Sequence, residues 1–271
     1  MNASIDAVIL GGGTLKGLEV SSGAGAADRR SKALLEIGGR EMIEYIIDAL
    51  RATPRIGKVI AVAPEMAKSE AWAERVDSVL PAGDTIIKNV AAAIKFLQDE
   101  NRPPGSRVLF LTCDIPLLSS EAINDFLERA DSIEGDVFYP IMSQTTMEAA
   151  FPETQRTYGR LKDGIFTGGN IALMIPEVVM GNLDLIENAF EARKSVPKLM
   201  RILGPRFIAK FATRTLTVPD IEKRMQHMTG ARTRAVETPF AVIGVDVDKP
   251  ADIILVEKEL AAAKAKGPSV S

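Results

Sequence analysis

Two sets of residues in this 271-residue chain could act on a phosphorylated substrate. Gly11, Gly12 and Gly13 directly follow a short apolar run, and glycines there let backbone N–H groups approach a phosphate closely. Asp114 and Asp246 each follow a later apolar run, where a carboxylate can hold Mg²⁺ together with water and substrate phosphates. The combination predicts nucleoside triphosphate chemistry, although a tight turn alone would also explain some of the glycines.

Two other glycine-rich motifs are excluded. The dinucleotide-binding pattern G-x-G-x-x-G fails because Lys16 stands where its last glycine should be, and no Gly-Lys-Ser/Thr follows to make a Walker A loop. Lys16 and Lys32 are the candidate phosphate-binding cations, and Lys32 heads an apolar segment where an exposed charge fits poorly. Residues 14–30 are rich in small side chains, which fits either a lid over the nucleotide or a disordered insertion.

Composition limits the partners and the compartment. A net charge of −3 gives no basic field, so we expect no nucleic acid partner. The single cysteine, Cys113, cannot form an intrachain disulfide, which favours a reducing compartment, and we expect it to be a buried apolar residue. No apolar run approaches the roughly 18 residues of a membrane span, and no signal peptide is apparent. We expect a cytoplasmic protein, with no membrane partner and with its oligomeric state open.

Apolar runs alternate with helical periodicity, which predicts a single three-layer α/β/α domain with a mainly parallel central sheet. We expect one domain over residues 1–265, with a helical elaboration at about 176–230 and a disordered tail at 266–271. The expected strands are 5–10, 58–63, 107–112 and 240–247, and the expected helices include 41–52, 84–99 and 250–264. Ligands of such sheets bind beyond the carboxyl ends of the strands, where the glycines and aspartates should meet.

The last expected strand carries Asp246 and Asp248. Alternation would put both side chains on one face, and a helix follows at once. We assign metal binding to Asp246 and the N-cap of that helix to Asp248. His227, the single histidine, is expected to be structural or exposed, so the sequence offers no histidine base beside these aspartates.

The glycine loop, Lys16, Lys32, Asp114 and the segment 246–252 together resemble the MobA-like NTP transferases, nucleotidyltransferases of the glycosyltransferase-A-type fold. The resemblance covers nearly the whole chain. It implies that an acceptor phosphate or hydroxyl attacks the α-phosphate of an NTP and releases pyrophosphate. By resemblance, the glycines and Lys16 hold the β- and γ-phosphates, Lys32 stabilises charge at the α-phosphate, and Asp114 and Asp246 bind Mg²⁺. Gly83 and Asn89 fall in the segment that contacts the base in this family.

The chain also departs from that family pattern. Lys16 replaces the usual arginine, the loop before Lys32 is longer, and residues 151–161 lie outside the pattern, which suggests a distinct small-molecule acceptor. Candidate acceptor contacts are Arg156, Arg160, Gly169 and Asn170, with Arg193 and Lys194 as further cations; these charges would fit an exposed surface equally well.

Two alternative functions remain open at this point. A glycosyltransferase that uses a nucleotide-sugar donor would more typically carry Asp-x-Asp in mid-chain, where this sequence has Asp114-Ile115-Pro116. A non-catalytic nucleotide-binding protein would not need Lys32, Asp114 and Asp246 together. Release of pyrophosphate would distinguish the nucleotidyltransferase from both.

Overall fold

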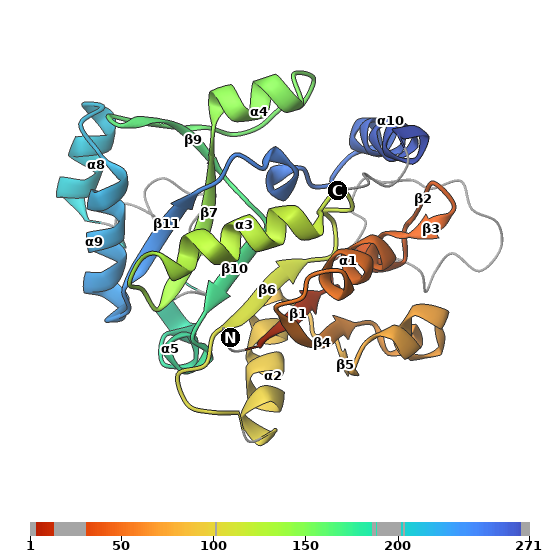
Figure 1. The fold of residues 1–271 in the computed structure, drawn as a ribbon. Coiled ribbons are helices and arrows are strands. Elements are labelled where there is room, and N and C mark those ends of the chain that lie inside the picture. Colours follow the sequence, from red (N-terminus) through yellow and green to blue (C-terminus); the bar gives the residue numbers. More distant parts are fainter. Residues whose placement is uncertain are drawn as a thin grey trace.

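A computed structural model describes residues 4–13, 31–100, 102–185, 188, 202 and 204–266 (Figure 1). Within these residues, one nine-stranded sheet has the order β5-β4-β1-β6-β10-β7-β9-β8, and β11 pairs with β7. β1 (Ile5–Leu10) lies between β4 (Ile56–Ala63) and β6 (Val108–Thr112), parallel to both, and β5 (Ser78–Pro81) is parallel to β4. The strands predicted at 5–10, 58–63 and 107–112 are therefore confirmed.

The other half of the sheet is mixed. β10 (Ile171–Met174) runs antiparallel to β6 and to β7 (Val137–Ser143), and β9 (Gly164–Gly168) is antiparallel to β7 and to β8 (Gly159–Leu161). β11 (Thr233–Glu237) is parallel to β7. The predicted α/β fold with parallel core strands is confirmed, but parallel pairing is confined to β5-β4-β1-β6 and the β7–β11 pair.

Helices cover both faces of the parallel strands. Ile5, Ala7 and Ile9 pack into one apolar cluster with α1 (Met42–Arg51) and α3 (Ser120–Asp131), whereas Val8 and Leu10 pack into another with α2 (Ile86–Asp99) and α5 (Pro176–Met180). Successive side chains of a strand point to opposite faces, so a strand covered on both sides reads as one continuous apolar run. Each fully buried aliphatic side chain contributes about 1.5–3 kcal/mol to this core.

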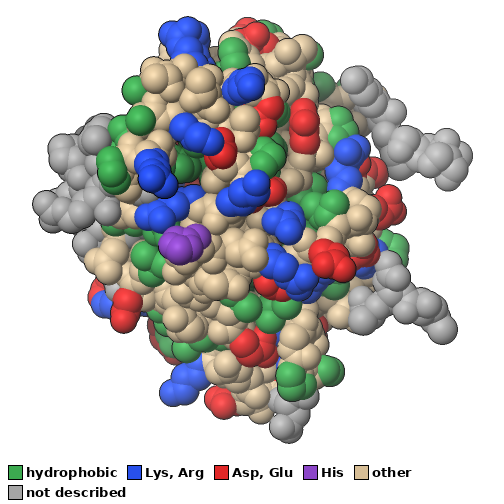
Figure 2. Space-filling view, turned by 90° about the vertical axis from the view of Figure 1, so that its left-hand side faces the viewer, with side chains coloured by type: hydrophobic (Ala, Val, Ile, Leu, Met, Phe, Trp, Pro, Cys, Tyr) green, Lys and Arg blue, Asp and Glu red, His purple; other side chains and the backbone are tan. Residues whose placement is uncertain are grey.

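Smaller elements surround this core. Two 3₁₀ helices, η2 (Glu65–Ser69) and η3 (Ala71–Arg75), follow β4, and a short hairpin joins β2 (Glu36–Ile37) to β3 (Arg40–Glu41). α4 (Gln144–Ala150) follows β7, while α8 (Pro205–Ala212) and α9 (Val218–Thr229) lie beside β11 at one end of the molecule. Figure 2 shows that end, where several exposed basic side chains gather. No helix of the described residues is long and apolar enough to span a membrane.

The strand predicted at residues 240–247 is wrong. The late strand is β11, and the predicted segment forms the 3₁₀ helix η4 (Ala241–Gly244) followed by extended chain. Its apolar side chains, including Ile243 and Val245, are buried in the main core, so burial rather than sheet pairing explains their pattern. The segment crosses the carboxyl end of β6, where the N–H of Val247 donates to the carbonyl oxygen of Asp114 at 2.9 Å. The closing helix α10 (Pro250–Lys266) follows, as predicted.

Candidate functional site

The glycine loop leaves the carboxyl end of β1, as predicted, and its three glycines differ in their surroundings. A Cβ at Gly11 would lie 3.0 Å from the carbonyl oxygen of Val62, and one at Gly12 would overlap Nδ2 of Asn89. Among the described residues, a Cβ at Gly13 would meet only the Lys32 side chain, at an ordinary 3.6 Å. Packing therefore explains the first two glycines, whereas Gly13 has no positive φ and no close neighbour within the described part of the chain that would require glycine.

The chain returns to this loop at the 3₁₀ helix η1 (Lys32–Leu34). The Ser31 hydroxyl donates to the carbonyl oxygen of Gly11 at 2.7 Å, and the N–H of Lys32 donates to that of Gly13 at 2.9 Å. These bonds place the Lys32 side chain directly beside the glycine loop. Lys16 lies outside the described residues.

Both residues predicted to contact the base lie against the glycine loop. Asn89 is on α2, is only 3% exposed, and its Oδ1 accepts a hydrogen bond from the N–H of Gly83 at 2.6 Å. Since a backbone N–H can pair only with the amide oxygen, this bond turns Nδ2 toward Gly12. Asn89 thus fixes the Gly83 loop relative to the glycine loop.

Three carboxylates meet beyond β6. Asp114 follows Cys113 at the strand end, and Asp246 and Asp248 come from the segment after η4; one carboxylate oxygen of each lies within 4.8 Å of the others. Oδ1 of Asp114 is buried and has no hydrogen-bond partner among the described residues. Clustered carboxylates with an unpaired buried oxygen suit a small divalent cation.

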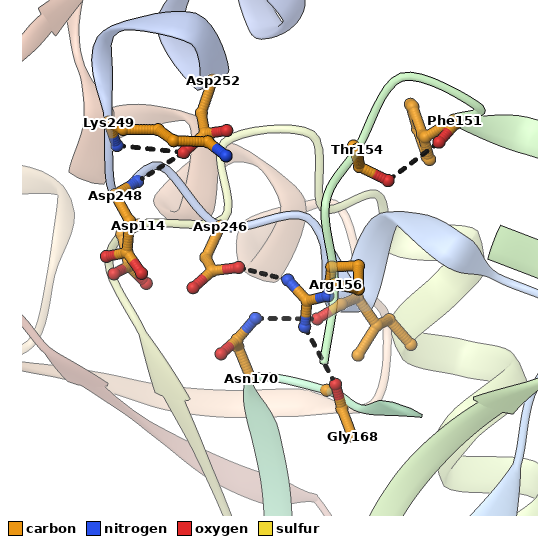
Figure 3. A network of polar contacts seen from close by, with 12 residues as sticks. Asp114, Phe151, Thr154, Arg156, Gly168, Asn170, Asp246, Asp248, Lys249 and Asp252 are labelled. Carbon is orange, nitrogen blue, oxygen red and sulfur yellow. Dashed lines mark hydrogen bonds and ion pairs between the residues drawn. The ribbon is translucent and has the colours of Figure 1, made fainter. Parts of the chain in front are cut away.

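The structure gives Asp248 a different role from the predicted N-cap. Its carboxylate binds Lys32, whereas the Asp252 carboxylate caps α10 by accepting from the N–H groups of Asp248 and Lys249, each at 3.0 Å (Figure 3). Asp248 therefore joins the two predicted metal ligands, Asp114 and Asp246, as a third candidate ligand.

Two cationic side chains neutralise most of this charge. Lys32 Nζ donates to Asp114 at 2.7 Å and to Asp248, and its side chain is only 14% exposed. Burial alone would lower the pKa of Lys32, but the two carboxylates outweigh it and raise that pKa above its usual value. On the other side, Arg156 Nη1 donates to Asp246 and Nη2 donates to the carbonyl oxygen of Gly168 at 3.2 Å (Figure 3).

The carboxylates respond differently to these partners. Burial raises the pKa of Asp246, and the neighbouring Asp114 and Asp248 add to that rise against the opposing charge of Arg156. Burial also acts to raise the pKa of Asp248, but the hydrogen bond and charge of Lys32 prevail and lower it. Because these carboxylates are close together and partly buried, additional positive charge at the cluster would stabilise their ionised forms.

The remaining predicted residues separate into two groups. Asn170 lies beside Arg156, and its backbone N–H and Nδ2 donate to the carbonyl oxygen of Ile243 at 3.0 and 3.4 Å (Figure 3). Gly169 is buried, and a Cβ there would lie 2.6 Å from Ile243 Cγ2, so packing accounts for this glycine. Arg160 is exposed on β8, away from the cluster's ion pairs.

Other sequence expectations concern residues outside the cluster. Cys113 is buried, as expected, and burial raises the pKa of its thiol. His227 is exposed on α9. Arg193 and Lys194 lie outside the described residues. Asp248 was not among the metal ligands predicted from the sequence, although its alternation with Asp246 was a usable signal for a third candidate ligand.

Comparison with known proteins agrees with this architecture. The profile of the MobA-like NTP transferase domain matches residues 7–174. A solved structure described as a hypothetical transferase from Thermus thermophilus is 31% identical, with a TM-score of 0.77, and the match covers 92% of this chain and 99% of that one. No curated protein sequence matches the chain.

Two more distant structures share the fold. One is 4-diphosphocytidyl-2C-methyl-D-erythritol synthase, 13% identical with a TM-score of 0.56 and coverage of 96% of this chain and 100% of that chain. The other is CMP:2-keto-3-deoxy-manno-octonic acid synthetase complexed with CTP, 12% identical with a TM-score of 0.56 and coverage of 97% and 100%.

Proposed function

Because the chain belongs to the MobA-like NTP transferase family and is therefore a nucleotidyltransferase, we propose that it transfers NMP from an NTP to a small acceptor. A phosphate or hydroxyl oxygen of the acceptor forms a bond to the α-phosphorus, and a hydroxyl acceptor gives up its proton to solvent. The bond from that phosphorus to the oxygen bridging the β-phosphate breaks, and pyrophosphate leaves. Such a transfer depends on positioning and charge neutralisation more than on covalent catalysis by the protein.

The observation that carries the proposal is the position of the three aspartates and Lys32 beside the glycine loop. Asp114, Asp246 and Asp248 would hold Mg²⁺, and the unpaired buried oxygen of Asp114 fits that role. A bound Mg²⁺ would supply positive charge to the triphosphate. Lys32 would add a fixed positive charge near the α-phosphate.

The glycine loop and the Gly83 loop would hold the nucleotide. The open space at Gly13 would let the backbone approach the β- and γ-phosphates, and Lys16 would add a cation there. Asn89, by fixing Gly83, would set the shape of the base-binding surface. Arg156 pairs with Asp246, whereas Lys32 pairs with Asp114, and Asn170 lies beside Arg156 (Figure 3). This arrangement supports Arg156 and Asn170 as acceptor contacts. We retain Arg160 and Gly169 as weaker candidates.

The test is thermal unfolding with each of the four NTPs, with and without Mg²⁺. An NTP at a hundredfold its Kd should add about 2.7 kcal/mol to the free energy of unfolding. We expect one NTP to give the largest shift and that shift to need Mg²⁺; an assay for pyrophosphate release over a panel of phosphorylated and hydroxylated acceptors then follows. A shift with nucleotide sugars only would replace the proposal by a glycosyltransferase, and no shift with either would leave it without support.

A further inference from the structure

Only some of the hydrogen-bond donors of Arg156 have a partner in the structure. Its guanidinium carries five N–H donors and no acceptor, and the structure engages it at two places, Asp246 and the carbonyl oxygen of Gly168. Its side chain is 16% exposed, so the group is largely buried and still reaches open space. It lies between α4 and β8, within residues 151–161, the segment that departs from the family pattern.

The charges of the cluster depend on whether a divalent cation is present. Three carboxylates face Lys32 and Arg156, which leaves one negative charge. A divalent cation turns this into one excess positive charge. The cation and the Arg156 guanidinium compete for the Asp246 carboxylate, because both are positively charged. Each therefore weakens the interaction of the other with Asp246.

Arg156 lines a pocket next to the aspartate cluster. The pocket has a volume of about 230 Å³ and lies between the Thr154–Gln155–Arg156 segment and residues 245–252. The carboxylates that line it already have partners: Arg156 for Asp246, Lys32 for Asp248, and backbone N–H groups for Asp252. Lys249 also lines the pocket, and its ammonium has no partner in the described part of the chain. If the guanidinium of Arg156 left Asp246, the pocket would offer two cationic donors, Arg156 and Lys249, to an anion.

We propose that Arg156 is an internal counter-ion that changes partner. A divalent cation at the aspartates releases the guanidinium from Asp246, and the released group binds an anionic group of the acceptor, a phosphate or carboxylate, in the adjoining pocket with Lys249. Arginine suits such groups because its planar donors pair with two oxygens at once. The inference rests on the proposed function for the reaction, and it adds that the acceptor is a small anion whose binding is coupled to the cation.

Coupling of this kind is reciprocal. If the bound cation increases the affinity of the protein for the anion, the bound anion must increase its affinity for the cation by the same factor. The coupling can therefore be measured without knowing the acceptor, with Mn²⁺ as the cation and inorganic phosphate as the anion. Free Mn²⁺ is followed by its electron paramagnetic resonance signal, and titrations without protein correct for direct Mn²⁺–phosphate association.

In the wild-type protein, saturating phosphate should tighten Mn²⁺ binding about fivefold or more. In Arg156→Gln, Mn²⁺ without phosphate should bind at least as tightly as in the wild type, because its competitor is gone, and the effect of phosphate should disappear. Arg206→Gln, a change at an exposed arginine of α8 that has no role in the candidate site, should behave as the wild type. Lys249→Gln, also at an exposed position, should reduce the phosphate effect and keeps the test available if Arg156→Gln does not fold.

Two results would overturn the inference. One is a phosphate effect of equal size in the wild type, Arg156→Gln and Lys249→Gln, which would place the anion elsewhere, such as the glycine loop. The other is a loss of Mn²⁺ affinity in Arg156→Gln as large as in Asp246→Asn, which would make Arg156 only a support for that carboxylate. Thermal unfolding with NTPs distinguishes a failure of this inference from a failure of the proposed function. If an NTP stabilises the wild type but the phosphate effect does not depend on Arg156, only this inference is wrong. If no NTP stabilises the protein, the proposed function is unsupported.

Discussion

The backbone N–H of Lys32 donates to the carbonyl oxygen of Gly13 at 2.9 Å, so the chain that leaves the glycine loop comes back to it at the lysine. The Ser31 hydroxyl adds a second bond to Gly11. Lys32 then reaches Asp114 from a backbone position that the loop itself fixes. The proposed phosphate-binding backbone and the cation that follows it therefore form one structural unit.

Replacement of Asp114 should separate catalysis from folding. Asp114→Ala removes the carboxylate that faces both Lys32 and the other two aspartates, and we expect turnover to fall by roughly two to three orders of magnitude. Mn²⁺ affinity should fall with it. The matched control is Asp99→Asn, at the exposed end of α2, which should leave both quantities unchanged. Near-wild-type turnover in Asp114→Ala would remove Asp114 from the metal site.

Gly13 should matter for the nucleotide and not for stability. In Gly13→Ala the new Cβ makes only ordinary contacts with the residues that the structure describes, so the free energy of unfolding should change by no more than about 0.5 kcal/mol. NTP affinity, measured by calorimetry, should fall about tenfold or more because the methyl group occupies the surface proposed for the phosphates. Gly12→Ala is the contrasting variant: its Cβ overlaps Asn89, so it should lose about 1–3 kcal/mol even without nucleotide. Unchanged NTP affinity in Gly13→Ala would contradict the phosphate-binding assignment.

Gly169 should matter for packing. A Cβ there would lie 2.6 Å from Ile243 Cγ2 and 2.9 Å from Pro140 Cγ, so Gly169→Ala should destabilise the fold by about 1–3 kcal/mol in urea unfolding. Gly181→Ala at the end of α5 is the control, since its Cβ meets only backbone oxygens at 3.8 Å; we expect a change within about 0.5 kcal/mol. If the two variants had equal stability, a Cβ at position 169 would be accommodated without cost, which would contradict the close packing around Gly169.

The Asp136–Arg232 pair should make stability depend on pH in the acid range. Hydrogen bonds from the Arg232 side chain and N–H hold the pKa of Asp136 below its usual value. A lowered folded-state pKa contributes stability above the unfolded-state value of about 3.9, and this contribution disappears as the pH falls through the folded-state value. Asp136→Asn should lower the Tm by about 2–4 °C at pH 7, with the difference from wild type shrinking below about pH 4. A difference that stays constant down to pH 2 would contradict the role of this pair.

The sequence predicted the structure best for elements that are determined by residues close together in the chain. β1, β4 and β6 are short apolar runs bounded by turn residues, and the aspartate beyond the third run lies at the strand end as predicted. Ser119 caps α3 by accepting from the N–H of Ala122, three residues further along the chain. Each of these features depends on residues close together in the chain.

Features set by distant contacts could not be read in the same way. Residues 240–247 have the apolar content of a buried strand, but contacts with β7 and α4 bury them as a 3₁₀ helix, and periodicity does not distinguish these cases. The pairing of Arg156 with Asp246 joins residues that lie far apart in the sequence. The sequence marked both as functional candidates, and only the fold shows that they bind each other.

The burial of Cys113 has a practical consequence for studying this protein. It is the only cysteine in the chain, it is 2% exposed, and its raised pKa keeps the thiol protonated, the form that does not react with alkylating reagents. A cysteine introduced at an exposed residue such as Arg160 would therefore be the single reactive thiol of the folded protein. A fluorophore or spin label can thus be attached at one chosen position without first removing a native cysteine.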